Sequence, residues 1–582
     1  MNEQQLQALE TMRHSFAHVL AQAVLRLYPG SKLGIGPVIE EGFYYDIEAP
    51  SRISADDLPQ IEAEMKRIID EGLVFKQIII PREQAFDTLH HLGQIYKTEL
   101  LQQIPDETIS FYKTGEEFID LCRGPHVHDT SQLRVFKLTS IETSYWLGDE
   151  NRPEMQRIIG VAFSHAAELE KYLKDQEDRK LRDHRILGRQ LGIFHLDQTQ
   201  GKGMPMLLHN GVMLKQSLAS MLKNRMIDQD YEFIESPEFI KESTLHAVRY
   251  LDYNRDVFMP QFQLENNMHR LRTDAVSQLF SAFSYKKRSY KELPLRLSEF
   301  AASYANIPVK DLHGLFKTRR FTRDNSVSFT AADQAIPEVK RIIKEMTSLL
   351  QQFELNDYRI ALGTPVQGAN GQHYIGNEQD WRDASYILEK ALSEMHITSR
   401  KTEGEAAFYG PTLQFRVRDV FRREWTIASV GIDLALPKIA NLTFVTAEGN
   451  DDTPVAIHHS FIGSFERFLG ILTEEYGGAF PTWLAPEQVR IIPISAKHTS
   501  HAKEVAEQLR HSGIRVFLDA RDETMQLKIR DAQIDRIPYM LIIGDKEIQT
   551  GSVSVRPRSG QDLGLMRTDE FAALIFKDRP GA

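Results

Sequence analysis

Apolar residues recur every three or four positions through the first thirty residues of the chain. They predict a helix from about Gln4 to Tyr28, which the sequence YPG then ends. His14 and His18 are four residues apart, so they share one side of this helix, roughly opposite Phe16. Both sides carry apolar residues, so we expect the helix to be central to its domain. The main stripe consists of Leu9, Met12, Phe16, Val19, Ala23 and Leu27.

Beyond this helix, short strand-like runs alternate with helical segments, which indicates an α+β domain over residues 1–165. Residues 166–189 are highly charged and predict a solvated linker helix at a domain boundary. Residues 190–481 form the largest block, with strands such as LPLRLSEFAASY and TLQFRVRDVF. In residues 482–582, apolar strands and helices alternate in the order βαβαβ, which predicts an α/β domain with a parallel or mixed sheet.

The composition is that of ordinary globular domains, with 42% hydrophobic and 26% charged residues in 582. No apolar run approaches the roughly 20 residues of a membrane helix, and the N-terminus does not resemble a secretory signal. The single cysteine cannot form an internal disulfide, so we expect a cytoplasmic protein. The net charge of −11 argues against a nonspecific DNA or RNA binder, but it leaves room for a specific RNA partner.

That cysteine, Cys122, lies in the stretch IDLCRGPHVHD, four residues before His126. Together with His14 and His18 it forms a His-x3-His plus Cys-x3-His pattern, which would satisfy tetrahedral zinc. The same residues could instead supply a nucleophile or line a substrate pocket. A purely structural origin, two histidines of a core helix and a buried thiol, is the remaining alternative.

Longer stretches decide which family the chain resembles. They include HSFAHVL, GPVIEEGFYYDI, DLCRGPHV, LHGLFKTRRFTRD, EAAFYGP, GSFERFLGILTEEY and YMLIIGDKE. Together they resemble bacterial threonyl-tRNA synthetases over nearly the whole chain. The resemblance implies an editing domain (1–165), a linker helix (166–189), a class II catalytic-like domain built on an antiparallel sheet (190–481) and an anticodon-binding domain (482–582). It starts at the editing domain, so we expect the family's small N-terminal ubiquitin-like domain to be missing.

The editing block matches the family at every position considered. By resemblance, these residues line a pocket that hydrolyses the ester of a wrongly charged tRNA. Family domains of this type work without a metal, although related alanyl-type editing domains use zinc, so a zinc site remains the rival interpretation. The matching residues are His14, His18, Tyr45, Lys97, Asp120, Cys122 and His126.

The catalytic block departs from the family. Ala305 stands where an arginine would clamp the ATP α-phosphate, and Ile307 replaces an acidic residue. Asn325 replaces the carboxylate that would hold the amino group of threonine. The family also binds threonine through zinc, yet two of the three ligand positions hold Val276 and Val327, and only His458 matches. Arg467 matches the arginine that stacks on adenine and marks a vestigial ATP site.

The anticodon block matches at Arg530, Glu547 and Arg556, which by resemblance read the anticodon loop. We therefore predict a homodimeric, threonine-tRNA-binding deacylase that removes serine in trans and needs no cofactor, its ATP and zinc sites being lost. Two alternatives stay open. The chain could be a ligase or aminoacyl-transfer enzyme with a remodelled amino-acid pocket, or a tRNA-binding regulator without chemistry. The acyl group removed could also be an unusual amino acid.

Overall fold

The computed structural model describes residues 3–149, 152–247, 250–251, 255–366 and 374–577. These residues divide into two compact units, Met1–Asp178 and Arg179–Ala582. We describe each unit by itself.

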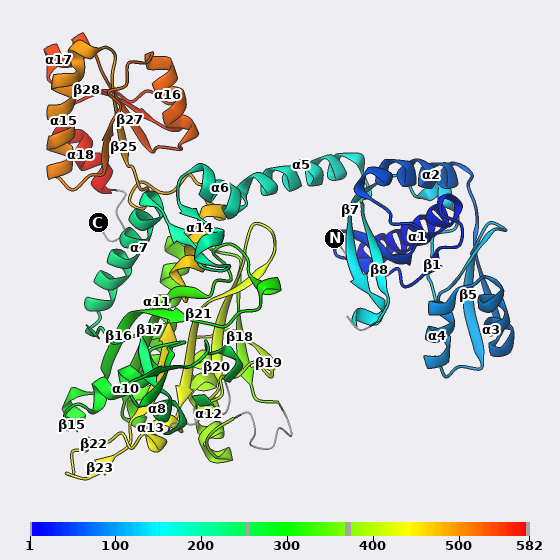
Figure 1. The fold of residues 1–582 in the computed structure, drawn as a ribbon, viewed down its shortest axis with the longest axis horizontal. Coiled ribbons are helices and arrows are strands. Elements are labelled where there is room, and N and C mark those ends of the chain that lie inside the picture. Colours follow the sequence, from blue (N-terminus) through cyan, green and yellow to red (C-terminus); the bar gives the residue numbers. More distant parts are fainter. Residues whose placement is uncertain (1–2, 150–151, 248–249, 252–254, 367–373, 578–582) are drawn as a thin grey trace. The chain divides into compact units, whose positions relative to one another are not determined.

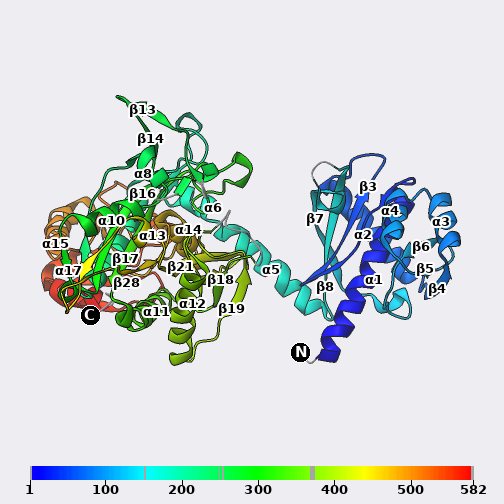
Figure 2. The same cartoon turned by 90° about the horizontal axis from the view of Figure 1, so that it is seen from below.

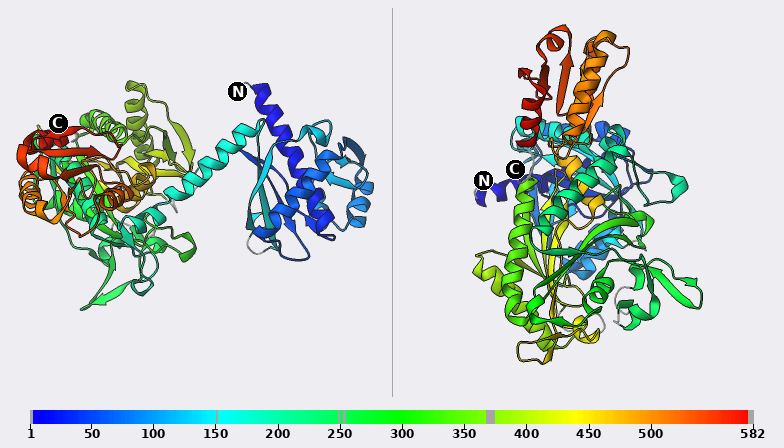
Figure 3. Two further views of the ribbon diagram at one scale, coloured as in Figure 1. Left: turned by 90° about the horizontal axis from the view of Figure 1, so that it is seen from above. Right: turned by 90° about the vertical axis from the view of Figure 1, so that its left-hand side faces the viewer.

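The first unit is built around α1 (Glu3–Leu27), which crosses it as one continuous helix (Figure 2, Figure 3). Phe16, Leu20 and Val24 are fully buried, and so are polar residues such as Ser15 on the other side of the helix. The prediction of a central helix is therefore confirmed. Further helices are α2 (Leu58–Asp70), α3 (Arg82–His91) and α4 (Ile95–Gln103).

Two sheets complete the described part of this unit. The larger has the order β1-β3-β8-β7, with β2 paired to β3, and α1 and α2 contact it. Its strands are β1 (Lys32–Leu33), β2 (Val38–Ile39), β3 (Gly42–Glu48), β7 (Phe136–Tyr145) and β8 (Glu154–Ala162). The smaller has the order β4-β5-β6, with strands β4 (Phe75–Pro81), β5 (Thr108–Thr114) and β6 (Phe118–Leu121).

The expected linker helix is two helices in the structure. The first, α5 (Ala166–Arg182), buries none of its residues and contains the division between the units. The second, α6 (His184–Gln190), starts at Asp183, whose carboxylate caps it, and buries His184 against α14 (Phe465–Glu475). Sequence charge predicted the solvated first half correctly, but the buried imidazole of the second half has a partner, Glu474, that is distant in sequence.

The second unit contains, among the residues described, an eight-stranded sheet in the order β11-β16-β17-β24-β21-β20-β18-β19 (Figure 1). Most neighbours are antiparallel, while β11 and β19 pair parallel to theirs. Helices α11 (Ala335–Gln352) and α12 (Glu378–Glu394) pack on it. The strands are β11 (Tyr231–Phe233), β16 (Leu295–Tyr304), β17 (Arg320–Thr330), β18 (Tyr358–Thr364), β19 (Arg400–Glu403), β20 (Thr412–Arg418), β21 (Glu424–Asp433) and β24 (Val455–Ser460).

Smaller elements surround this sheet. The helices are α7 (His209–Ile227), α8 (Glu242–Ala247), α10 (Val276–Ser284) and α13 (Leu436–Ile439). Short strands form small sheets and comprise β9 (Phe194–His195), β10 (Met206–Leu207), β12 (Phe239–Lys241), β13 (Phe262–Leu264), β14 (Asn267–Leu271), β15 (Arg288–Ser289), β22 (Phe444–Val445) and β23 (Asp451–Asp452).

The last hundred residues form the predicted mixed sheet, in the order β26-β25-β27-β28-β29. Strand β25 is parallel to both neighbours, and α16 (Met525–Ile534) lies across the sheet from α15 (Thr499–His511) and α18 (Thr568–Lys577) in Figure 1. The remaining helix is α17 (Asp545–Thr550). The strands are β25 (Val489–Pro493), β26 (Val516–Leu518), β27 (Tyr539–Ile543), β28 (Val553–Pro557) and β29 (Gly564–Met566).

Candidate functional site

Four side chains from two distant stretches meet in the first unit, and we call them the His–Cys cluster: His14, His18, Cys122 and His126. The histidines of α1 face the loop that follows β6. The Cys122 Sγ lies 3.4 Å from His14 Nε2 and 3.3 Å from His126 Nε2. One potential ligand atom from each of the four residues lies within 4.8 Å of the others. The four-residue spacing of Cys122 and His126 therefore reflects an irregular loop, neither a helix turn nor a strand.

The loop holds its shape through Gly124. Its φ of +73° favours glycine, and a Cβ there would lie 2.4 Å from the Tyr112 hydroxyl. The Gly124 N–H donates to Cys122 Sγ at 3.2 Å, and the Val127 N–H donates to the Ser15 hydroxyl of α1 at 3.1 Å. Backbone geometry thus presents the thiol and the imidazole to the helix.

The Ser15 hydroxyl assigns the tautomer of His126. It donates its one proton to the Thr11 carbonyl at 2.9 Å and accepts from Val127, so its 3.1 Å contact with His126 Nδ1 requires Nδ1 to donate. The His126 Nε2 then carries a lone pair and accepts from the Cys122 thiol. A neutral imidazole with one acceptor nitrogen results.

A buried ion pair lies beside the cluster. Lys97 of α4 donates to Asp120 at 2.7 Å, and the Tyr45 hydroxyl of β3 donates to the same carboxylate. His18 Nε2 lies 3.6 Å from Asp120, and its Nδ1 is buried with no hydrogen-bond partner among the described residues. Because the Lys97 ammonium is paired with Asp120, its positive charge is already balanced by that carboxylate.

Burial sets the ionisation of the cluster. Burial lowers the pKa of His14, and it lowers the pKa of His18 far below its ordinary range. It lowers the pKa of His126 to about 2. It also raises the pKa of the Cys122 thiol to about 11. At neutral pH the cluster holds neutral imidazoles and a protonated thiol, which is a poor nucleophile.

The His–Cys cluster also has the residue types of a zinc site. Tetrahedral zinc places its ligand atoms roughly 3.3–3.8 Å apart, and the two cysteine–histidine spacings fit that range. They equally fit the hydrogen bonds just described. In the S–H···N hydrogen bond the thiol keeps its proton and occupies the His126 lone pair, so zinc would have to displace that proton to gain both ligands.

Four of the altered positions of the second unit, but not Ile307, line one cavity of about 400 Å³ together with His458, and we call it the central cavity. Val276 comes from the start of α10, Val327 and Asn325 from β17, and His458 from β24, while Ala305 follows β16. Tyr409 also lines it. Two charged residues, Asp274 and Arg323, also line the central cavity. The sequence did not identify them, because neither stands at one of the motif positions on which the resemblance rests.

The residues of the central cavity do not fit zinc. Val327 and His458 are directly opposite each other in the β17–β24 ladder, so a metal held by His458 would meet a valine. The remaining donor is engaged, because His458 Nε2 contacts the buried Asp433 carboxylate at 2.9 Å. With Val276 at the other position, two of three ligands are missing.

The residues at the positions of the expected ATP site likewise form contacts within the protein. The Arg467 guanidinium donates to the Phe316 carbonyl at 2.9 Å and lies 5.5 Å from the Trp425 ring centre. Near Ala305, the Ile307 carbonyl accepts from Arg319 at 3.0 Å. Position 305 itself is an alanine and supplies no guanidinium for an ATP phosphate.

The three predicted anticodon-reading residues lie on different elements of the C-terminal sheet domain. Arg530 is exposed on α16, and Arg556 is on β28 opposite Met540. Glu547 is buried in α17, where its carboxylate accepts from the Gly544 N–H at 2.9 Å and caps that helix. The structure thus gives Glu547 a structural role in addition to any contact with RNA.

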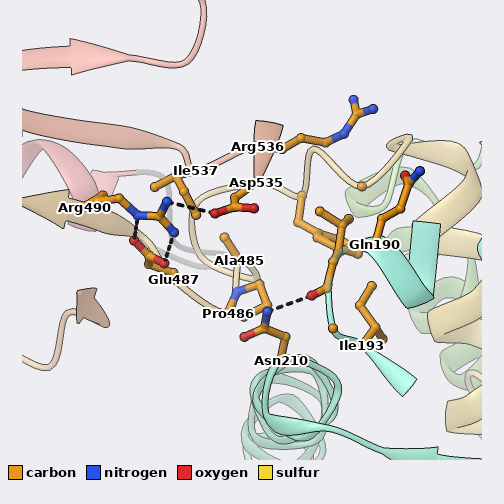
Figure 4. Close-up of a pocket in the computed structure, with 14 residues that line it drawn as sticks. Gln190, Ile193, Asn210, Ala485, Pro486, Glu487, Arg490, Asp535, Arg536 and Ile537 are labelled. Carbon is orange, nitrogen blue, oxygen red and sulfur yellow. Dashed lines mark hydrogen bonds and ion pairs between the residues drawn. The ribbon is translucent and has the colours of Figure 1, made fainter. Parts of the chain in front are cut away.

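A further cavity of about 270 Å³ lies in the second unit between residues 190–210 and 478–537 (Figure 4). Of its two arginines, Arg490 is ion-paired with Glu487 at 2.7 Å and Asp535 at 2.8 Å, while Arg536 also lines the cavity. Asn210 donates to the Leu191 carbonyl, so most of the polar groups drawn in Figure 4 have partners within the protein.

Comparison with known families places three segments. Residues 109–159 match the threonyl and alanyl tRNA synthetase second additional domain, 262–476 the tRNA synthetase class II core domain (G, H, P, S and T), and 488–578 the anticodon binding domain. The first match contains Cys122 and His126 but not His14 or His18, which only the fold brings in.

The chain is also similar to full-length threonine–tRNA ligases over nearly its whole length. The chain is 38% identical to the threonine–tRNA ligase of Oceanobacillus iheyensis over 98% of its length and 88% of the relative, and 39% identical to that of Thermus thermophilus over 96% and 87%. A crystal structure described as the RNA binding domain of threonyl-tRNA synthetase from Cryptosporidium parvum superposes with a TM-score of 0.65 at 27% identity, covering 69% of this chain and 99% of that one. Within the described residues, no helix is both long and apolar enough to span a membrane.

Proposed function

Since this chain belongs to the threonyl-tRNA synthetase family, we propose that it binds threonine tRNA and hydrolyses serine wrongly attached to it, without charging the tRNA. One contrast carries the proposal. The seven residues expected for hydrolysis are assembled around the His–Cys cluster, while the central cavity lacks the arginine clamp and two of three zinc ligands.

Removing serine is a task that a ligase pocket alone performs poorly. Serine differs from threonine by one methyl group, which is worth only about 1–3 kcal/mol of discrimination in binding. A second pocket that admits serine and excludes the extra methyl group corrects the error. Here the rings of Phe75 and Tyr112 lie 5.0 Å and 4.5 Å from that of His126, and they supply rigid walls for such size selection.

The hydrolysis needs a base that takes a proton from water, and the selectivity for serine needs a group that excludes the methyl group of threonine. In our proposal a water oxygen adds to the ester carbonyl and gives its proton to a neutral imidazole of the cluster. The bond from the carbonyl carbon to the ribose oxygen breaks, and that oxygen takes the proton back from the imidazolium, so serine and uncharged tRNA result and the imidazole is neutral again. Cys122 positions His126 by donating its S–H to Nε2, and the Lys97–Asp120 ion pair lies beside the cluster.

Two further features belong to the same proposal. The C-terminal domain, through Arg530 and Arg556, supplies the grip on the anticodon loop. The class II-like sheet supplies the surface for a homodimer, which analytical ultracentrifugation tests directly. Neither the editing reaction nor the grip on tRNA requires ATP or zinc in this account.

The test is single-turnover hydrolysis with the full chain in excess over charged threonine tRNA. We expect the serine ester to disappear at least ten times faster than the threonine ester, the lower limit for exclusion of one methyl group. A panel of other acyl groups identifies the substrate if serine is poor. A serine ester as stable with protein as in buffer contradicts the proposal and favours a tRNA-binding regulator.

A further inference from the structure

Three buried polar side chains at and near His18 each have an atom without a hydrogen-bond partner among the described residues. The atoms are His18 Nδ1, Gln22 Oε1 and Thr114 Oγ1, and the three residues are 2%, 1% and 0% exposed. Buried polar atoms almost always have a partner, either in the protein or in an ordered water molecule. Three such atoms in one region therefore need an explanation.

The fold brings these residues to the same contact between α1 and the smaller sheet of the first unit. His18 and Gln22 are four residues apart and share one side of α1. Thr114 ends β5 directly opposite Phe118 of β6, and the Phe118 ring lies 5.8 Å from the His18 ring. The Gln22 amide donates to Glu117, the residue before Phe118, at 2.7 Å. Phe118 and the residue before it are thus neighbours of all three.

Asp120 determines which nitrogen of His18 carries the proton. Burial keeps this imidazole neutral by lowering its pKa, so it has one N–H and one lone pair. Its Nε2 lies 3.6 Å from the Asp120 carboxylate, which also accepts from Lys97 and from the Tyr45 hydroxyl. An N–H is attracted to a carboxylate and a lone pair is repelled by it, so Nε2 carries the proton. The lone pair is then on Nδ1, which needs a donor.

The other two atoms complement this lone pair. Glu117 orients the Gln22 amide, since a carboxylate accepts only from its N–H₂ end, and Arg26 donates to the same carboxylate at 2.8 Å. Gln22 Oε1 is therefore an acceptor that needs a donor, as His18 Nδ1 is. Thr114 has a single hydroxyl proton, so it can serve at most one of these two acceptors. One water molecule can donate to both acceptors and accept from the Thr114 hydroxyl, which satisfies all three atoms.

We propose that His18 Nδ1, Gln22 Oε1 and Thr114 Oγ1 bind one buried water molecule, and that Gln22 and Thr114 are positioning residues for His18. Three hydrogen bonds are the usual number for a buried water molecule. The bound water occupies the Nδ1 lone pair and keeps the Nε2 proton directed at Asp120. His18 therefore holds Asp120 and does not take the proton from the attacking water. The effect on hydrolysis rests on the proposed function, whereas the water site and the tautomer do not.

The tautomer is measured by nitrogen-15 NMR of the full chain labelled in its histidines, with the His18 signals assigned by their loss in His18→Gln. In the wild type the proton should be on Nε2, and the Nδ1 signal should be that of an unprotonated nitrogen that accepts a hydrogen bond. Thr114→Val keeps the shape of the side chain and removes the hydroxyl, so it should shift the Nδ1 signal. Thr139→Val, at an exposed position of β7, is the matched control and should leave this signal unchanged.

Kinetics test whether the two positioning residues share one water molecule. Thr114→Val and Gln22→Met should each slow hydrolysis of the serine ester about three- to tenfold at saturating protein, the usual range for loss of one hydrogen bond. The two effects should not multiply in the double variant, because both substitutions remove the same water molecule. His18→Gln, whose amide can still donate to Asp120, should be faster than His18→Leu, and equal rates would overturn the role of His18 as that donor.

The proposal is overturned if His18 carries its proton on Nδ1 in the wild type, or if Thr114→Val leaves the Nδ1 signal where it is. Effects that multiply in the double variant overturn the shared water molecule. Should Gln22→Met fail to fold, the NMR comparison of Thr114→Val with the wild type still decides. If the wild type has the expected tautomer but hydrolyses no serine ester, the proposed editing function fails and the water site stands, so the two failures are distinguishable.

Discussion

Lys97 is a buried lysine whose charge is balanced by a single carboxylate. It is 4% exposed and Asp120 is 3% exposed, so truncating the lysine would leave an uncompensated buried charge. We predict that Lys97→Ala lowers the free energy of unfolding of the first unit by about 3–5 kcal/mol. Pulse proteolysis of the full chain in urea, with cleavage assigned to residues 1–178, measures this change.

Two comparisons make the Lys97 result specific. Adding Asp120→Asn to Lys97→Ala removes the orphaned charge and should recover part of the loss. Lys113→Ala, which breaks an ion pair with the exposed Glu116, should cost at most about 1 kcal/mol. Equal effects of Lys97→Ala and Lys113→Ala would mean that Asp120 does not depend on its lysine.

The neutral imidazole of His126 predicts a pH dependence of stability. Its pKa is lowered to about 2 in the folded chain from an ordinary 6.5, so below pH 6.5 the unfolded chain binds a proton that the folded chain does not. The free energy of unfolding should therefore fall by about 1.4 kcal/mol for each pH unit below 6.5, and His14 and His18 add to the fall.

The matched variant for this prediction is His126→Gln, which stays neutral at every pH. Its stability should fall less steeply, by about 1.4 kcal/mol per pH unit, between pH 6 and about pH 5. Pulse proteolysis at several pH values measures both slopes. Parallel curves for the variant and the wild type would show that His126 is protonated in the folded chain.

At the scale of elements, the β17–β24 pair explains why a single reversion should not restore a ligase. Position 327 is directly opposite His458, and His458 contacts Asp433, so both of these contacts, together with position 276, would have to change. We predict no ATP–pyrophosphate exchange with threonine, serine or valine, for the wild type or for Ala305→Arg. Robust exchange by the wild type would contradict the proposal that this chain does not charge tRNA.

The expected zinc content follows from the residues of the central cavity and of the His–Cys cluster. Val276 and Val327 remove two ligands of the central cavity, and the thiol of Cys122 is protonated in the His–Cys cluster. Elemental analysis of protein purified without chelator should give less than half an equivalent of zinc per chain. If about one equivalent is found, its loss in Cys122→Ala would assign the metal to the His–Cys cluster and contradict the proposal that hydrolysis there needs no metal.

The sequence predicted elements better than it predicted their partners. Helical spacing located α1 within a residue at each end, and the βαβαβ order of the C-terminal domain predicted its mixed sheet. It could not place the break at Asp183, because the buried partner of His184 is Glu474, nearly three hundred residues away. Charge within a segment does not reveal such a partner.

The candidate sites show the same limit. Motif spacing identified His14, His18, Cys122 and His126, and the structure brings them together. The Ser15 hydroxyl, which assigns the His126 tautomer, sits between the two histidines of α1 with no motif of its own. The sequence did not identify Arg323 and Asp274 as residues of a common site, because only the fold brings them into the lining of one cavity.

At the scale of the whole molecule, binding and hydrolysis are assigned to different units. Arg556 lies in the second unit and His14 in the first, so their variants should separate the two steps. Arg556→Ala should raise the tRNA concentration needed for half-maximal rate and leave the rate of bound tRNA nearly unchanged. His14→Ala should do the reverse, because it acts on the transition state. Equal effects on both quantities would contradict this division.

The most direct measurement follows the serine ester on threonine tRNA under single-turnover conditions, with wild type and His14→Ala side by side and no ATP present. We predict rapid loss of the serine ester with the wild type, at least ten times slower loss of the threonine ester, and a large drop in rate for His14→Ala at saturating protein. A serine ester that persists with wild-type protein as long as it does in buffer would show that the chain does not hydrolyse it.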